Sequence, residues 1–333
     1  MNRLALIMLS CGVSFAACDE GAEGTGNDAI DAEVADTSRP DAPTPWIYPD
    51  DEDEVTPSLQ PAALQKAVEV AMTAALELKP EVVLQLHQLL YPTPETGSGD
   101  PTGCPFFLTY DYDTATGFYW QGECTASDGT MFSGYGSVSI YDKFTNEFGT
   151  FDGFDVNLSG RIEAADGTFL EGSGQAGAYL GTAQDLTSVA GVIDGTFLAG
   201  GPRAPDSPWL DGSRRPSLSI NGWVYTPTGG RNVTVAGGIA GLDFPAGVSA
   251  VSLDNLTARQ ALAGASCERE LGGGASVRGE DGNWYDVYFD GPSDEDADTP
   301  ADLCDGCGVT WFRGAEVGAT CVDARPFLKQ ATP

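Results

Sequence analysis

The chain has 333 residues, of which 41% are hydrophobic and 10% aromatic, enough apolar material for one large domain or two small ones. Its 49 acidic and 16 basic side chains give a net charge of −33, which repels phosphate backbones and argues against nucleic acid as a partner. The 43 glycines and 21 prolines favour short strands and turns over long helices. We therefore expect a mainly β globular protein.

Residues 1–17 have the features of a signal peptide. Arg3 supplies the positive charge, residues 4–15 form a mostly apolar stretch, and Ala16 and Ala17 are the small residues that a signal peptidase requires. Twelve residues are too few for a helix to cross about 30 Å of hydrocarbon. This segment predicts export and not a transmembrane anchor.

The segment Phe15-Ala16-Ala17-Cys18 resembles the lipobox of bacterial lipoproteins, in which the cysteine is acylated and becomes the new N-terminus. Phe15 stands where that motif usually has leucine. The resemblance implies lipidation of Cys18, the membrane as a partner through this anchor, and a place in the cell envelope facing the periplasm or the cell surface. Because it covers only the export signal, it implies nothing about activity. Free secretion, with Cys18 as a spare thiol, is the alternative.

Residues 18–57 are predicted to be a disordered acidic linker. They contain 13 acidic side chains, one basic side chain and almost nothing to bury, so folding would not offset the entropy of ordering them. The remaining chain has 36 acidic and 14 basic side chains, a net charge of about −22.

Residues 58–95 are predicted to form a short helical hairpin. Ser58 is placed to cap the first helix and Pro61 fits its first turn, while Pro80 begins the second helix. His87, the only histidine of the sequence, lies among apolar residues of the second helix, where packing is more frequent than catalysis. The apolar residues of the first helix recur at three- and four-residue intervals at Leu64, Val68, Ala71, Ala75 and Leu78.

Residues 104–328 are predicted to form a β-rich domain. β-prone runs such as 106–110 and 137–141 are separated by turn signals, including an Asp-Gly-Thr triplet at Asp128, Asp166 and Asp194. These patterns predict an antiparallel, multi-stranded sheet of about ten to fourteen strands, which must curl, close into a barrel or split into a sandwich. The Pro-rich passage 200–216 either divides this domain or is a surface loop, and one continuous sheet is favoured.

Six cysteines follow Cys18, an even number that predicts three disulfides in an exported protein. Spacing favours Cys104 with Cys124 and Cys307 with Cys321, which leaves Cys267 with Cys304, although fifteen pairings of six cysteines exist. The Cys-x-x-Cys spacing at 304–307 also fits a redox dithiol or half of a zinc site, but no second pair accompanies it.

One acidic loop partly matches the calcium-binding loop of an EF-hand. Thr299 replaces the required glycine and Asp305 replaces the bidentate glutamate, so a solvated acidic loop is the simpler interpretation. Calcium is the one cofactor that the sequence suggests; otherwise we expect none. The candidate ligands stand at loop positions 1, 3, 5, 9 and 12, which are Asp294, Asp296, Asp298, Asp302 and Asp305.

Sequence motifs for nucleophilic, phosphoryl-transfer or zinc-protease catalysis are absent. We expect a non-enzymatic binding or scaffolding β domain with a surface glycan or protein as partner. A secreted carbohydrate-active enzyme with a carboxylate pair and a calcium-dependent adhesion module are the alternatives. Some aromatic residues could stack on sugars if they are exposed and do not belong to the core. These residues are Trp120, Tyr135, Trp223, Trp284 and Trp311.

Overall fold

The computed structural model describes residues 56–92, 100–112, 115–146, 149–183, 186–225, 230–260, 267, 269–291 and 304–330. The chain divides into two compact units, residues 1–34 and 35–333, and all described residues belong to the second. The predicted signal peptide, Cys18 and nearly all of the predicted linker lie outside the described residues.

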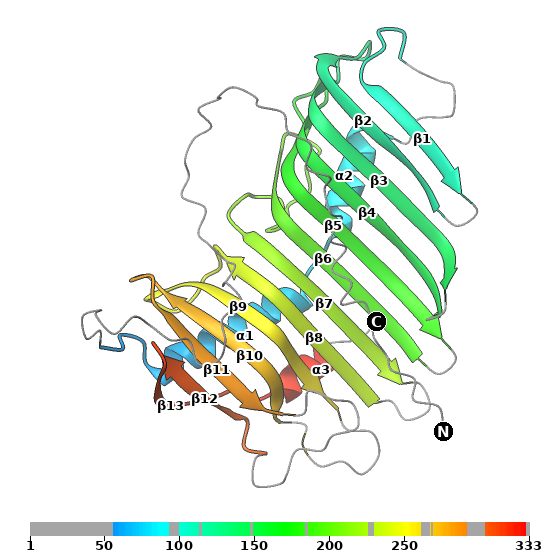
Figure 1. Cartoon of the computed structure of the whole chain (residues 1–333). Helices are drawn as coiled ribbons and strands as arrows, with labels where there is room; N and C mark the ends of the chain where they lie inside the picture. The colour runs from blue at the N-terminus through cyan, green and yellow to red at the C-terminus, as the bar shows by residue number, and fades with distance from the viewer. Residues whose placement is uncertain are drawn as a thin grey trace, which may run out of the picture. The chain divides into compact units, whose positions relative to one another are not determined.

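The described part is built around one antiparallel sheet of thirteen strands, in which every strand pairs with the next along the chain (Figure 1). This confirms the predicted mainly β, antiparallel class. The sheet is open, with its first and last strands at the two edges, so it neither closes on itself nor splits into two layers. The strands are β1 Phe106–Tyr112, β2 Ala115–Thr125, β3 Met131–Asn146, β4 Gly149–Glu163, β5 Phe169–Ala183, β6 Leu186–Gly200, β7 Arg215–Tyr225, β8 Gly230–Ala240, β9 Val248–Arg259, β10 Leu271–Gly279, β11 Trp284–Asp290, β12 Cys307–Phe312 and β13 Ala315–Cys321.

The Pro-rich passage lies between β6 and β7 and does not divide the domain, because these two strands pair directly with each other. Two of the predicted Asp-Gly turns are confirmed: Asp128 and Asp166 each accept the backbone N–H two residues further on, at 2.8 and 2.9 Å. The third prediction was wrong, because Asp194 lies within β6. There Gly195 faces the backbone of β5 so closely that a Cβ would meet the Ser173 oxygen at 2.1 Å, so this glycine serves close strand approach and not a turn.

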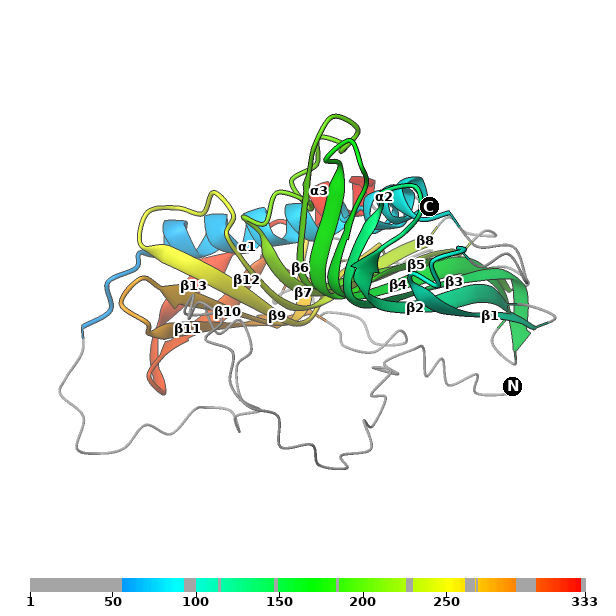
Figure 2. The same cartoon turned by 90° about the horizontal axis from the view of Figure 1, so that it is seen from above.

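Two helices precede the sheet, as predicted, and a third ends the described chain: α1 Pro61–Leu76, α2 Glu81–Leu90 and α3 Arg325–Gln330. All three lie on the same side of the sheet (Figure 2). α1 contacts strands between β7 and β13, whereas α2 contacts β4 and β5, so each helix of the predicted hairpin packs on its own part of the sheet. Among the described residues, no helix is both long and apolar enough to span a membrane.

Ser58 does not cap α1, contrary to the prediction. The N-cap is Gln60, with Pro61 in the first turn and no side-chain hydrogen bond. Ser58 instead reaches the sheet, where its backbone N–H donates to the Tyr285 hydroxyl at 2.6 Å and its hydroxyl to Asp281 at 3.1 Å. A tertiary partner has therefore replaced the local capping role.

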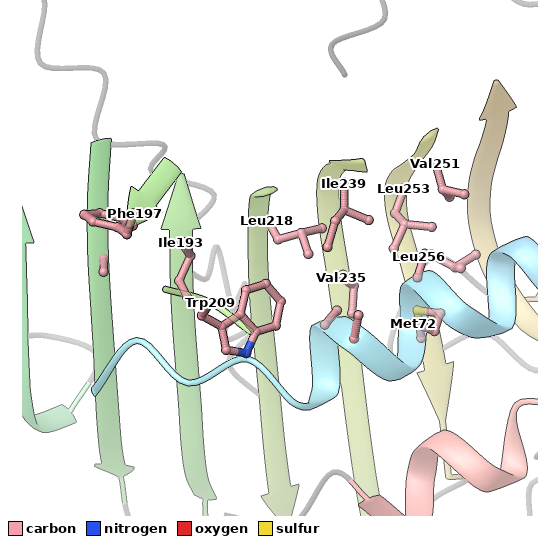
Figure 3. Close-up of a cluster of buried hydrophobic side chains, with 14 of the residues drawn as sticks. Met72, Ile193, Phe197, Trp209, Leu218, Val235, Ile239, Val251, Leu253 and Leu256 are labelled. Carbon is pink, nitrogen blue, oxygen red and sulfur yellow. The ribbon is translucent and has the colours of Figure 1, made fainter. Parts of the chain in front are cut away.

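The helices and the sheet enclose one apolar core on the face that we call the inner face (Figure 3). Met72 of α1 and Trp209 of the loop between β6 and β7 cover side chains of the strands, and the Trp209 indole N–H donates to the Glu77 carbonyl at 3.2 Å. Each fully buried aliphatic side chain contributes about 1.5 to 3 kcal/mol. The strand residues in this view include Ile193, Phe197, Leu218, Val235, Ile239, Val251, Leu253 and Leu256.

The six cysteines form three disulfides: Cys104–Cys124, Cys267–Cys304 and Cys307–Cys321. This is the pairing that spacing favoured. Because Cys304 and Cys307 are bonded to different partners, they do not form the redox dithiol or the half zinc site that their spacing also fits.

Candidate functional site

The face of the sheet opposite the helices carries a group of aromatic side chains on β1 to β5. Side chains alternate between the two faces of a strand, so Phe118 and Trp120 of β2 are buried on the inner face while Tyr119 points the other way. We call this opposite face the outer face. Among its most exposed residues are Phe106 at 56%, Leu108 at 57% and Tyr135 at 49%. Other aromatic side chains of this face include Tyr110, Tyr119, Tyr141, Phe144, Phe151 and Tyr179.

Several aromatic side chains of the outer face lie close against glycines of the neighbouring strand. A Cβ at Gly117 would stand 2.4 Å from the Tyr110 hydroxyl oxygen, and a Cβ at Gly153 would stand 2.7 Å from the Tyr179 ring. Phe151 covers Gly181 in the same way, at 2.6 Å. An aromatic ring that covers a glycine shields its backbone and is itself held in place. These rings therefore form a preorganised aromatic surface.

Asp155 of β4 lies at the centre of this surface. The Tyr141 hydroxyl donates to Asp155 Oδ2 at 3.0 Å and the Tyr179 hydroxyl donates to the same oxygen at 2.5 Å. The two tyrosines flank Gly153 across the sheet, with ring centroids 5.8 Å apart. The other oxygen, Oδ1, lies over Gly177, where a Cβ would approach it to 2.5 Å.

Both phenols beside Asp155 stay protonated at physiological pH. Burial, followed by the charge of Asp155, raises the pKa of Tyr141 to about 12. Burial and the hydrogen bond to Asp155 raise the pKa of Tyr179 further. The two phenols therefore remain hydrogen-bond donors to Asp155 near neutral pH.

Hydroxyl and amide groups surround the rings. The Tyr110 hydroxyl reaches across β2 to within 2.5 Å of the Ser139 hydroxyl. On the same face Asn157 donates to the Ser137 hydroxyl at 3.4 Å, and Tyr119 donates to a neighbouring glutamine oxygen at 3.1 Å. Tyrosine with serine, asparagine and glycine combines rigid contact area with adaptable hydrogen bonding, as in the binding surfaces of antibodies.

Charges near the outer face are largely paired. Arg161 forms ion pairs with Glu163 at 2.7 Å and with Glu171 at 2.8 Å, and its guanidinium covers the Phe169 ring at 3.7 Å. The surface from Tyr110 to Tyr179 therefore offers a ligand aromatic rings, hydroxyl groups and the Asp155 carboxylate.

A cavity of about 300 Å³ on the inner side is a weaker candidate. Its wall includes Tyr91, Phe132, Asp100 and Asp128. Asp100 already accepts backbone N–H groups of Thr102 at 2.8 Å and of the turn at 127 at 3.0 Å, and Asp128 also holds its own turn. Both carboxylates of the described wall therefore already serve local structure, which makes this cavity a weaker ligand site than the outer face.

The predicted calcium ligands Asp294, Asp296, Asp298 and Asp302 lie outside the described residues. Asp305 is described, and its carboxylate accepts the Cys307 N–H at 2.8 Å at the start of β12. Nearby, Glu270 is 2% exposed and accepts the Gly306 N–H at 2.7 Å, and burial raises its pKa. Among the residues that the structure describes, no three His, Cys, Asp or Glu side chains are arranged to hold a metal ion. The calcium site stays a prediction.

His87 is a packed core residue, as predicted. It is fully buried, its Nε2 accepts the Trp120 indole N–H at 3.1 Å, and burial lowers its pKa to about 4. Its Nδ1 has no hydrogen-bond partner in the described part of the chain. Trp120 is therefore unavailable for stacking on a sugar, whereas Tyr135 is exposed for it.

Comparison of the chain with protein-family models, with curated proteins and with solved structures finds no match. The site is therefore interpreted from its geometry. Among the residues that define it, sequence reasoning identified Tyr135 and missed Tyr110, Tyr141, Asp155 and Tyr179. The alternation of polar and apolar residues along 135–141 and 151–159 could have indicated that their polar positions share one face. It could not have indicated which of them meet.

Proposed function

We propose that this chain is an exported lipoprotein, anchored through Cys18, whose outer face on β1 to β5 binds a glycan chain of the cell envelope without chemically altering it. The observation that carries the proposal is the set of aromatic rings held against glycines around Asp155. The three disulfides support an oxidising compartment outside the cytoplasm. The export signal and the lipobox-like segment support the anchor.

The chemistry of the outer face suits a sugar. A pyranose ring presents C–H groups on its two faces and hydroxyl groups around its edge. Exposed aromatic rings such as Tyr135 can cover the C–H faces, while Asp155 Oδ1 and the Ser139 hydroxyl can bond the edge. Because the rings and phenols are already held in place, binding loses little side-chain entropy.

Charge narrows the class of glycan. The chain has a net charge of −33, and Arg161, a cation of the outer face, is paired with two glutamates. An acidic polysaccharide would be repelled by this field. A neutral glycan is therefore the expected ligand.

The test is affinity electrophoresis of the full chain through gels containing a neutral β-glucan, a neutral α-glucan or xylan. We expect retardation by at least one of the three. Tyr135→Ala should weaken the retardation roughly fivefold or more, since removing one stacked ring forfeits about 1 kcal/mol or more. Asp155→Asn should also weaken it. Leu180→Ala, which alters a half-exposed apolar side chain on the inner face, is the matched control and should migrate like the unsubstituted chain.

Three results would contradict the proposal. If none of the polysaccharides retards the chain, the outer face does not bind neutral glycans. If Tyr135→Ala and Leu180→Ala behave alike, binding occurs elsewhere. If the polysaccharides become shorter during incubation, the chain is an enzyme, and the carboxylate-pair alternative replaces the binding role.

A further inference from the structure

The two edges of the sheet differ in their protection against pairing with another strand. At one edge, β13 carries Glu316 and has Gly318 at a φ of 134°, and its pairing with β12 is irregular between Thr310 and Trp311. A charged side chain, a glycine and an irregularity are the features by which proteins keep an edge strand from recruiting partners.

The other edge, β1, has one charged residue, as β13 does, but has neither the glycine nor the irregular pairing. Its seven residues pair with β2 in continuous register from Phe106 to Tyr112, without a bulge. Within β1 there is no proline, no glycine and no lysine, and Asp111 is its one charged residue. Phe106 and Leu108 are the two most exposed of the large hydrophobic side chains among the described residues, at 56% and 57%. In the described part of the chain β2 is the one strand that β1 pairs with, and β1 is an edge strand of the sheet.

We infer that β1 pairs antiparallel with β1 of a second copy of this chain, which joins the two sheets into one. The register that overlaps all seven residues places Thr109 opposite its own counterpart. It also places Leu108 opposite Tyr110 and Phe107 opposite Asp111 of the other copy. In this register no two like charges face each other, and the aromatic–aliphatic and Thr–Thr pairs are favourable cross-strand neighbours. The strand is therefore complementary to itself.

The same register keeps the two outer faces on one side. Because side chains alternate along a strand, residues 106, 108 and 110 of each copy lie on the outer face. The aromatic surface therefore continues across the junction. The inference stands apart from the glycan proposal, because it depends on the strand edge and not on a ligand. If both hold, one long glycan chain would contact two copies at once.

Charge opposes this pairing and makes it depend on salt. The chain after residue 57 carries a net charge of about −22, so two copies repel each other at low ionic strength. Pairing of two seven-residue strands is a small interface of the transient class. We therefore expect a weak dimer that salt strengthens, because the Debye length falls from about 10 Å at 0.1 M to about 3 Å at 1 M.

The first test is sedimentation equilibrium of the full chain with Cys18→Ser, which removes the acylated thiol. The experiment uses up to about 100 μM protein in about 0.05 M and about 1 M sodium chloride. We expect a monomer–dimer equilibrium that shifts at least tenfold towards dimer at the higher salt. Leu108→Lys should be monomeric in both buffers. Leu180→Lys, at a similarly exposed leucine away from the edge, should dimerise like the parent.

The second test fixes the register. Under mild oxidation, with Cys11 and Cys18 replaced by serine in every chain compared, Thr109→Cys should give a chain of doubled mass on a non-reducing gel, because residue 109 meets itself across the two-fold axis. Val317→Cys, at an exposed position of the opposite edge, should stay at single mass. A parent chain that is monomeric at both salt concentrations overturns the inference. A dimer that Leu108→Lys does not weaken, or a cross-link at 317 and not at 109, overturns it as well.

Discussion

Acidification from pH 7.5 to pH 5.0 should destabilise the protein through one side chain, His87. Burial lowers the pKa of His87 to about 4, whereas an exposed histidine of the unfolded chain has a pKa of 6.5. Between these two values the unfolded chain binds a proton that the folded chain does not. Stability is therefore lost as the pH falls from about 6.5 towards about 4 and is fully present above 6.5.

The size of the effect follows from the two pKa values. The full difference of about 2.5 pKa units corresponds to about 3 kcal/mol, and the part realised by pH 5.0 is about 2 kcal/mol. The structural cause is that His87 is fully buried and its Nε2 accepts the Trp120 N–H. A proton on that nitrogen would break this hydrogen bond and place a charge in an apolar core.

Urea unfolding at pH 7.5 and at pH 5.0 measures the effect, with His87→Gln as the matched variant. Glutamine offers Trp120 an acceptor oxygen and does not titrate. Since His87 is the only histidine in the sequence, the variant should lack the loss of about 2 kcal/mol that we expect for the parent chain. Because the pKa of Glu270 is raised, its contribution to stability increases as the pH falls, and this contribution is the same in both proteins. Equal losses of stability in the two proteins would refute the reasoning.

Three other changes have defined outcomes. Gly153→Ala should destabilise the fold by about 1 to 3 kcal/mol in urea unfolding and also weaken glycan retardation, because its Cβ would meet the Tyr179 ring at 2.7 Å. Leu218→Ala should lose about 2 to 5 kcal/mol, because this side chain is 1% exposed, whereas Leu180→Ala should lose less than 1 kcal/mol. The intact mass of the native mature chain should begin at Cys18 with added acyl chains, and reduction of the three disulfides should add six hydrogens; an unacylated product would contradict the anchor.

The local features of the fold followed from the sequence because their causes are local. Pro61 marks the first turn of α1 and Pro80 precedes α2, since proline fits a helix start. Asp128 and Asp166 hold their turns through their own carboxylates. Asp194 and Gly195 have the Asp-Gly sequence of a turn but lie within β6, where Gly195 allows two strands to approach closely, so the turn predicted at Asp194 was wrong.

The sequence by itself determined that this protein is mainly β and that two helices precede its strands. The spacing of the cysteines along the chain also indicated which of them pair in disulfides. Alternation, turn residues and spacing carry that information within a few residues. Only the tertiary structure decided that the sheet stays open beneath its helices, and that Tyr141 and Tyr179 meet at Asp155 across Gly153. Those contacts depend on the register between strands, which is set by hydrogen bonding and packing across the whole sheet and not by any one segment.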